Sequence, residues 1–116
     1  MVYVALEVVK ALKNYSIFAG VIDLFIINPV NEAKLFKVIK DAKYVVTLEE
    51  HSLVGGLGSS LCRIKQAQAN KFKFKAIGLQ SNYYGAFNDR QLARCINKID
   101  VDSIVEEIRH WIRNDA

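Results

Sequence analysis

The stretch Val45–Ser60 reads VVTLEEHSLVGGLGSS, and it predicts a strand, a polar turn, a glycine-rich loop and the start of a helix in close succession. Tyr44–Leu48 is a short apolar run of the kind found in parallel sheets. The loop Gly55–Gly58 then leads into a helix. Because function in parallel α/β sheets gathers at the carboxyl ends of the strands, we expect a candidate functional site directly after Leu48.

Hydrophobic spacing and turn residues on both sides of this stretch predict further helices and strands. Toward the N-terminus we expect a first helix with the apolar face Ala5, Val8, Val9 and Leu12. The later part of 17–27 is expected to form a strand that is buried on both faces and ends at Asn28-Pro29. A second helix is expected after Asn31, its cap, with the apolar face Leu35, Val38, Ile39 and Ala42. Toward the C-terminus we expect a helix through Leu57, Leu61, Ile64 and Ala67, then a strand over 72–79 and a short helix over 89–97. The last helix is expected from Asp102-Ser103, where Ser103 and Glu106 form a possible capping box. Its buried stripe is predicted to be Ile104, Ile108, Trp111 and Ile112.

This alternation predicts the fold class α/β, as a three-layer α/β/α sandwich around a mainly parallel sheet. The chain opens on a helix and supplies three predicted strands, so the first strand of the sheet is apparently missing.

Length and composition predict a single domain over residues 1–116. Apolar residues make up 52% of the chain and charged residues 24%. The formal charge of +4 favours solubility and attraction of anionic partners, but it does not by itself indicate nucleic acid. No apolar run approaches the roughly 20 residues needed to cross a bilayer, and no secretory signal is visible, so we expect a cytoplasmic protein. Cys62 and Cys95 lie in apolar helical patterns and are predicted to be buried, reduced thiols, with a disulfide or metal pair as the lesser alternative.

The glycine-rich loop admits two interpretations. Its glycines allow close packing of a helix against a sheet or a second subunit, which is the favoured reading, while free amides at the helix start could bind an anion. The spacing matches neither GxGxxG nor the P-loop, so no nucleotide fingerprint supports the second reading.

The polar residues before the loop are the candidates for acid–base chemistry. Glu49 and Glu50 are adjacent on an extended segment and should point in opposite directions, so we expect no carboxylate dyad. His51 is the best candidate for a polar site role, and its alternative is a hydrogen-bonded histidine that fixes the loop. His110 is predicted to be a surface histidine. No catalytic, cofactor-binding or metal-ligating residue is predicted.

Two further patterns can be interpreted either as ordinary structure or as a binding function. The interleaved Lys71–Lys75 could suggest nucleic acid, but a half-buried strand with both phenylalanines inward gives the same pattern and is favoured. Tyr83, Tyr84 and Gly85 could contact a partner or only close a turn.

The quoted residues resemble the carboxyl-terminal domain of the transketolase family of thiamine-diphosphate enzymes. The resemblance is carried by Val46–Ser52 followed by Gly55–Ser59, with support from Gly20–Leu24, Ile27–Asn31 and the strand Ala76–Leu79. The Glu-Glu-His form is most similar to transketolases, including those divided into two subunits. The resemblance also implies that such a domain begins with a strand that is absent before the first helix here.

The resemblance implies a domain that helps to assemble a dimer and supports the site, within an enzyme that transfers a two-carbon ketol unit between sugar phosphates. Thiamine diphosphate and magnesium would belong to the parent enzyme, because this chain has no Gly-Asp-Gly and should not bind them or be active alone. Expected partners are the remaining cofactor-binding domains or subunit, in a homodimer or heterotetramer, with no nucleic acid or membrane. Candidate loop and interface residues are Glu49, Glu50, His51, Gly55, Gly56, Gly58 and Ser59.

Two alternatives stay open. The chain could belong to the beta component of a 2-oxoacid dehydrogenase or to deoxyxylulose-phosphate synthase. It could also be a stand-alone module that binds an anion or a protein.

Overall fold

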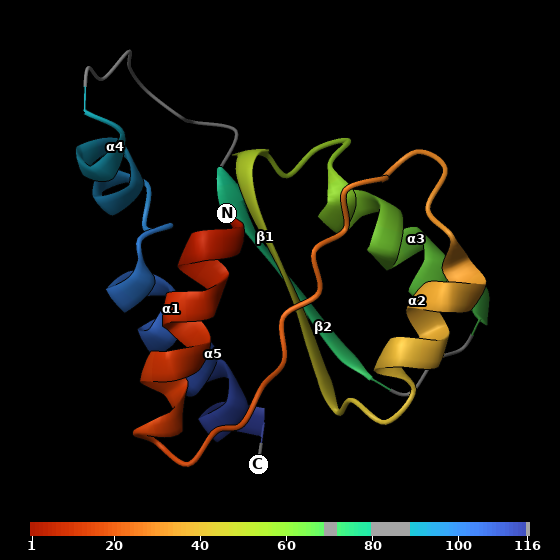
Figure 1. The fold of residues 1–116 in the computed structure, drawn as a ribbon, viewed down its shortest axis with the longest axis horizontal. Coiled ribbons are helices and arrows are strands. Elements are labelled where there is room, and N and C mark those ends of the chain that lie inside the picture. The colour runs from red at the N-terminus through yellow and green to blue at the C-terminus, as the bar shows by residue number, and fades with distance from the viewer. Residues whose placement is uncertain (69–71, 80–88, 116) are drawn as a thin grey trace. The chain divides into compact units, whose positions relative to one another are not determined.

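A computed structural model describes residues 1–68, 72–79 and 89–115, which divide into two compact units (Figure 1). One unit comprises residues 1–23 and 82–116, and the other comprises residues 24–81. The described elements are α1 (Val2–Lys13), α2 (Glu32–Ile39), β1 (Tyr44–Ser52), α3 (Leu57–Gln68), β2 (Lys73–Leu79), α4 (Arg90–Ile96) and α5 (Val101–Asp115). None of the helices within those ranges is long and apolar enough to cross a membrane.

Strands β1 and β2 form a parallel pair in the second unit, as predicted. Tyr44 pairs with Lys73 and Leu48 with Ile77, and the register shifts before Ser52 meets Leu79. The strand β1 extends beyond the apolar run, so that it includes the polar residues from Glu49 to Ser52. The candidate site therefore begins on a strand, which gives its side chains a fixed alternation between the two faces of the sheet.

Helices α2 and α3 share one hydrophobic core with the strands. Its buried members are Leu35, Ile39, Leu61 and Phe72, and Leu24, Val30 and Phe74 pack against them. The side chain of Asn31 accepts a hydrogen bond from Lys34 N, which confirms the predicted helix cap. Val38 was predicted on the buried face and is instead 66% exposed. At 100° per residue it lies about 60° from Leu35, on the side away from Ile39, so it misses the contact.

The alternating basic and aromatic residues around β2 follow the favoured reading. Phe72 is buried, Phe74 is half-buried and Lys73 is exposed, as a strand with inward phenylalanines requires. Lys71 and the turn candidates Tyr83, Tyr84 and Gly85 lie outside the described residues.

In the first unit, α1 packs against α5. The buried residues of α1 are Val4, Val8 and Leu12, and those of α5 are Ile104, Val105 and Ile108. The predicted stripes were therefore partly wrong: Ala5, Val9, Trp111 and Ile112 are only half-buried. The contact between two helices is a narrow seam, and residues at its margins stay partly open.

The start of α5 differs from the predicted capping box. The helix begins at Val101, and Asp100 Oδ1 and Oδ2 accept hydrogen bonds from Ser103 N and Ser103 Oγ at 3.1 and 2.6 Å. Glu106 bonds instead to Arg109. Asp100 caps the helix because a carboxylate placed one turn before Ser103 is the stronger acceptor for the helix amides. The short helix α4 matches its prediction, with Asp89 as its cap.

The predicted strand within 17–27 is absent: this segment has no regular secondary structure. Phe25 is 86% exposed, and Phe18, Ile22, Ile26 and Ile27 are also exposed. A strand requires a neighbouring strand for its hydrogen bonds, and among the described residues the sheet consists only of β1 and β2. The apolar, β-branched sequence is therefore present without the backbone partner that would make it a strand.

The predicted burial of the cysteines was wrong. Cys62 and Cys95 are both exposed and both are free thiols. Cys62 lies on an exposed side of α3, and Cys95 lies on α4, which has no buried residue. The position of a cysteine in an apolar pattern does not settle whether its side chain faces a core.

Candidate functional site

The candidate site is built around the carboxylate of Glu49. Glu49 and Thr47 are only 4% exposed, and both side chains point to the face of the sheet that α3 covers. Glu50 is half-buried, and the alternation of side chains along β1 places it on the opposite side from Glu49.

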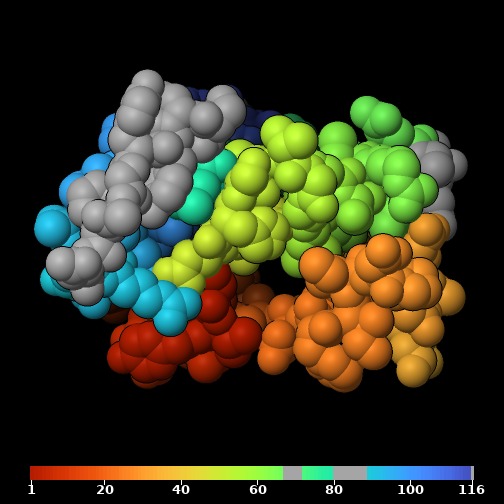
Figure 2. All heavy atoms as spheres, turned by 90° about the horizontal axis from the view of Figure 1, so that it is seen from above, coloured from red at the N-terminus to blue at the C-terminus, as the bar shows by residue number. Residues whose placement is uncertain are grey.

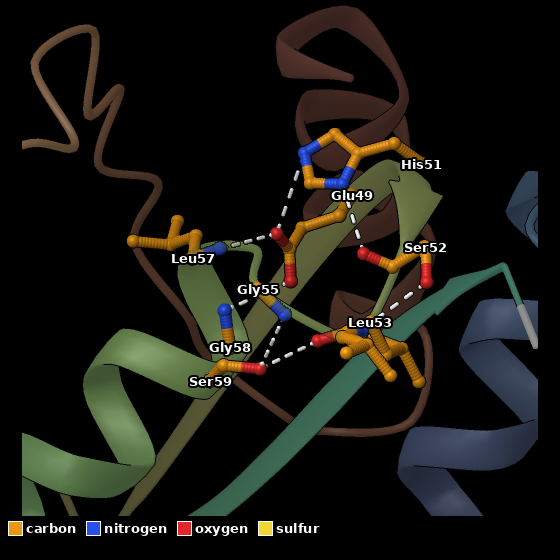
Figure 3. Close-up of polar contacts among 9 residues, drawn as sticks. Glu49, His51, Ser52, Leu53, Gly55, Leu57, Gly58 and Ser59 are labelled. Carbon is orange, nitrogen blue, oxygen red and sulfur yellow. Dashed lines mark hydrogen bonds and ion pairs between the residues drawn. The ribbon is translucent and has the colours of Figure 1, made fainter.

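Glu49 holds the first turn of α3. Its Oε1 accepts a hydrogen bond from Leu57 N at 2.5 Å, and its Oε2 accepts one from Gly58 N at 2.9 Å (Figure 3). These amides have no partner within the helix, and the helix dipole favours a negative charge at this end. The buried charge of Glu49 is therefore balanced by the helix start, and the carboxylate has a structural role.

A second set of hydrogen bonds closes the loop between β1 and α3. Ser59 Oγ donates to Leu53 O at 2.6 Å and accepts from Gly55 N at 3.1 Å. Val54 N donates to Ser52 Oγ at 3.2 Å. The loop is thus tied at both ends and in the middle, which gives it a defined shape.

Three of the loop glycines are required by this geometry. A Cβ on Gly56 would overlap Glu49 Oε1 and lie 2.7 Å from His51 Cε1. Gly55 has φ +78°, a conformation that side chains rarely adopt. A Cβ on Gly58 would lie 2.7 Å from Ala76 Cβ and 3.0 Å from Glu49 Oε2. Gly58 therefore lets the helix approach the sheet closely enough for Glu49 to reach its amides.

His51 lies beside the same carboxylate. Its Nε2 is 3.5 Å from Glu49 Oε1, and its Nδ1 is 3.0 Å from Ser52 O. In the tautomer with the proton on Nδ1, the ring donates to that carbonyl. The side chain is nevertheless 58% exposed, so His51 both contacts the loop and presents part of its ring to the outside.

The loop presents an apolar side chain on the surface. Val54 is 82% exposed. Figure 2 shows the yellow-green atoms of this part of the chain at the molecular surface. A hydrogen-bonded loop that carries an exposed valine and a half-exposed histidine has the chemistry of a protein contact.

These contacts count against the anion interpretation. The amides of Val54, Gly55, Leu57 and Gly58 all donate to side chains of the chain itself. The position that an anion would take at the start of α3 is filled by Glu49. Within 1–68, 72–79 and 89–115, no group of three or more His, Cys, Asp or Glu side chains is arranged to hold a metal ion.

The structure brings together most of the residues that the sequence singled out. Glu49, His51, Gly55, Gly58 and Ser59 gather at one end of β1 (Figure 3), and Gly56 lies against Glu49 and His51. The contributions of Ser52, Leu53 and Leu57 were not predicted, because these residues act through a hydroxyl and backbone groups. It also missed Thr47, whose buried Oγ1 has no hydrogen-bond partner. Extending the alternation of the strand beyond Leu48 would have placed Thr47 and Glu49 on one face. His110 is exposed, as predicted.

Known proteins with similar sequences cover almost the whole chain. It is 32% identical over 105 residues to a subunit of the apulose-4-phosphate transketolase of Actinobacillus succinogenes, an alignment that covers 90% of this chain and 34% of that protein. It is also 32% identical over 108 residues to a 1-deoxy-D-xylulose-5-phosphate synthase of Halothermothrix orenii, covering 90% of this chain and 16% of the synthase. The chain thus spans about a third or less of these relatives.

The fold has a solved counterpart. A structure described as a split-gene transketolase, an inactive beta4 tetramer, superimposes with a TM-score of 0.77 at 24% identity, covering 94% of this chain and 35% of the other. This likeness confirms the α/β fold class. The family model for the transketolase C-terminal domain matches residues 1–94. The chain therefore belongs to the transketolase C-terminal domain family.

Proposed function

We propose that this chain is the C-terminal domain or subunit of a transketolase-like, thiamine-diphosphate-dependent enzyme that transfers a two-carbon ketol unit between sugar phosphates. Its own role is to assemble with the parts of the enzyme that bind the cofactor and to support the site they form. Family membership and the similarity to a protein named as one subunit of a transketolase support this proposal.

The assembly role is supported mainly by the hydrogen bonds of Glu49 to the first turn of α3. This side chain is the buried carboxylate of the candidate site, and both of its oxygens accept amides of α3. A general base must come within hydrogen-bond reach of its substrate, and Glu49 is only 4% exposed. Glu49 therefore serves the architecture of the loop, and we assign no catalytic residue to this chain.

The residues of the chain do not fit the cofactor. A diphosphate would need free amides or cationic side chains, and the loop amides already bond to Glu49, Ser52 and Ser59. The sequence contains no Gly-Asp-Gly. We therefore assign thiamine diphosphate and magnesium to the partner domains or subunit.

The contact surface that we propose is the loop and its flanks. His51 and Val54 offer a half-exposed ring and an exposed apolar side chain, and the network behind them fixes both. Pre-ordered side chains lose little entropy on binding, which favours them as contacts. The loop residues Glu49, Gly55, Gly56, Gly58 and Ser59 act behind this surface by holding its shape. The assembly would be a homodimer or a heterotetramer of two kinds of subunit.

The proposal is tested by reconstitution. The chain is mixed with the polypeptide of the same genome that carries Gly-Asp-Gly and matches the rest of a transketolase, together with thiamine diphosphate and magnesium. We expect ketol transfer between sugar phosphates only in the mixture. A stable complex without any such activity would contradict the assigned reaction, and failure to form a complex would contradict the assembly role.

A second reaction is favoured by one comparison. The 32% identity to a 1-deoxy-D-xylulose-5-phosphate synthase makes that synthase the main alternative. The same reconstituted mixture distinguishes the two, because formation of 1-deoxy-D-xylulose 5-phosphate in place of ketol transfer would assign the chain to the synthase. Calorimetry of the chain alone with inorganic phosphate tests the anion-binding module, and we expect no heat of binding.

A further inference from the structure

The charge of the chain is divided unequally between its two units. Residues 24–81 contain nine Lys and Arg and four Asp and Glu, which gives a formal charge of +5. Residues 1–23 and 82–116 contain seven and eight, which gives −1. Glu49, one of the four carboxylates of the basic unit, is buried and bonded to α3. The positive charge of the chain is therefore carried by the unit that contains α2 and α3.

The outer side of α2 carries three exposed lysines in regular spacing. Lys34, Lys37 and Lys40 follow one another at intervals of three residues and span about 120° of the helix surface. The buried residues of α2 lie on the other side, against the core. We call these three lysines the basic face of α2.

The charges of the basic face are not balanced within the chain. Like charges three residues apart on one side of a helix repel each other and destabilise it. Among residues 1–68, 72–79 and 89–115, no carboxylate forms an ion pair with Lys34 or Lys37. Lys40 lies 3.9 Å from the carboxylate of Asp41, which is itself exposed.

Two other helices pair a basic side chain with an acidic one a turn earlier. Lys10 of α1 pairs with Glu7 at 2.6 Å, and Arg109 of α5 pairs with Glu106. A local arrangement that lowers the stability of a helix without compensation inside the chain is expected where the surface has another use. The spacing on α2 therefore indicates a surface that meets negative charge from outside.

An exposed apolar side chain within the same surface indicates the class of partner. Val38 is 66% exposed and lies about 40° from Lys34 around the helix. Every residue of α2 is described, and none is an arginine or an exposed aromatic residue, the groups that stack on nucleic-acid bases. The wide apolar side of α2 is buried in the core and is not available to a membrane. A protein segment with carboxylates and an apolar side chain matches both the lysines and the valine.

We propose that the basic face of α2, together with Val38, binds an acidic segment of a protein other than the cofactor-binding part of the enzyme. Carboxylates of the segment pair with the three lysines, and an apolar side chain between them packs on Val38. Binding relieves the repulsion among the lysines, and the charge of the basic unit speeds association. The contact proposed above for the cofactor-binding part is the loop at Val54, so this inference goes beyond the proposed function and does not depend on the reaction.

The test measures binding of a synthetic acidic peptide to the full chain. The probe is a fluorescein-labelled peptide of about twelve residues, enough to span α2, in which glutamates flank one central leucine. Fluorescence anisotropy gives the Kd, which we expect to be about 10–100 μM at low salt. It should rise about tenfold when the salt concentration is raised from about 50 to about 500 mM. Absence of binding at low salt, or binding that does not depend on salt, would overturn the proposal.

Charge reversals locate the binding surface. Lys34→Glu and Lys37→Glu should each weaken binding of the peptide by about tenfold. Lys13→Glu makes the same charge change at an exposed position of α1 and should alter the Kd by less than about twofold. Lys34→Glu should also raise the Tm of the free chain by about 1–3 °C, because a carboxylate in the first turn favours the helix and attracts Lys37. Weaker binding by a more stable chain excludes unfolding as the cause, and equal losses for Lys34→Glu and Lys13→Glu would contradict a defined surface.

Three further measurements test the class and identity of the partner. A peptide with serine in place of the leucine should bind about threefold or more weakly, and an unchanged Kd would contradict the contact with Val38. Equal or tighter binding of duplex DNA or of phosphatidylserine vesicles at the same salt, lost in Lys37→Glu, would overturn the choice of a protein segment. Weaker assembly of Lys37→Glu with the Gly-Asp-Gly polypeptide would overturn the separate partner and leave the proposed function standing.

Discussion

Glu49 Oε2 accepts a hydrogen bond from Gly58 N at 2.9 Å and thereby joins the end of β1 to the first turn of α3. The two residues depend on one another. The absence of a side chain at Gly58 lets the helix come close, and the carboxylate of Glu49 occupies the helix end that this approach exposes. The loop between them owes its shape to this pair, so substitutions at either residue should act on stability first.

Replacing Glu49 tests the anchor. Glu49→Ala leaves the amides of Leu57 and Gly58 without their acceptor and should lower the free energy of unfolding by about 2–4 kcal/mol. Glu49→Gln keeps one acceptor oxygen and should cost about 1–2 kcal/mol. Chemical denaturation measures both. Glu106→Ala, which removes an exposed pair with Arg109, is the control and should cost less than about 1 kcal/mol. Equal losses at Glu49 and Glu106 would refute the anchoring role.

Replacing Gly58 tests the close approach. Gly58→Ala places a Cβ 2.7 Å from Ala76 Cβ and should destabilise the chain by about 1–3 kcal/mol. Gly20→Ala is the matched control, because nothing lies within 4 Å of its added Cβ, and it should change stability by no more than about 0.5 kcal/mol. Denaturation midpoints compare the two, and a neutral Gly58→Ala would show that α3 does not pack as closely as described.

Acid should weaken the cap of α5. Partial burial acts to raise the pKa of Asp100, but the hydrogen bonds from Ser103 outweigh it and hold that pKa below its ordinary value. A lowered pKa in the folded state gives stability that is present above the unfolded pKa of about 3.9 and is lost as the pH falls through the folded pKa. The stability difference between wild type and Asp100→Asn should therefore shrink as the pH is lowered from about 5 toward about 2. Denaturation at several pH values measures it, and a constant difference would contradict the assignment.

The contact surface is tested at Val54. Val54→Asp should leave the stability of the isolated chain within about 0.5 kcal/mol of wild type, because the side chain is exposed. It should weaken binding to the cofactor-binding polypeptide by about tenfold or more, measured as the Kd by calorimetry. Val38→Asp, on the exposed side of α2, is the control and should bind normally. Unaltered binding of Val54→Asp would place the interface elsewhere.

Several features of the fold could be predicted because their signals are local. Asn31 caps α2 as predicted, since a capping side chain bonds an amide only three residues away. The parallel pairing of β1 with β2 follows from the helix between them. The residues of the candidate site could also be predicted, because they share one short stretch at the end of a strand.

The roles of those residues could not be predicted in the same way. Whether the carboxylate of Glu49 meets a cation, a proton or a helix end depends on where the amides of Leu57 and Gly58 come to lie, and that is a matter of packing. The predicted capping box of Ser103 and Glu106 was wrong for a related reason. The sequence offered more than one acceptor near the start of α5, and in the structure Asp100 Oδ1 accepts the hydrogen bond from Ser103 N.

The sequence by itself determined the helices, the parallel pairing of β1 with β2 and the place of the site, because periodicity and capping act over a few neighbouring residues. Only the tertiary structure decided which sides of the helices are buried, as the exposed Cys62 and Val38 show. It also decided the state of residues 17–27, whose strand-like sequence lacks a neighbouring backbone. A strand is a property of two segments, and its hydrogen bonds cannot be supplied by the sequence of one.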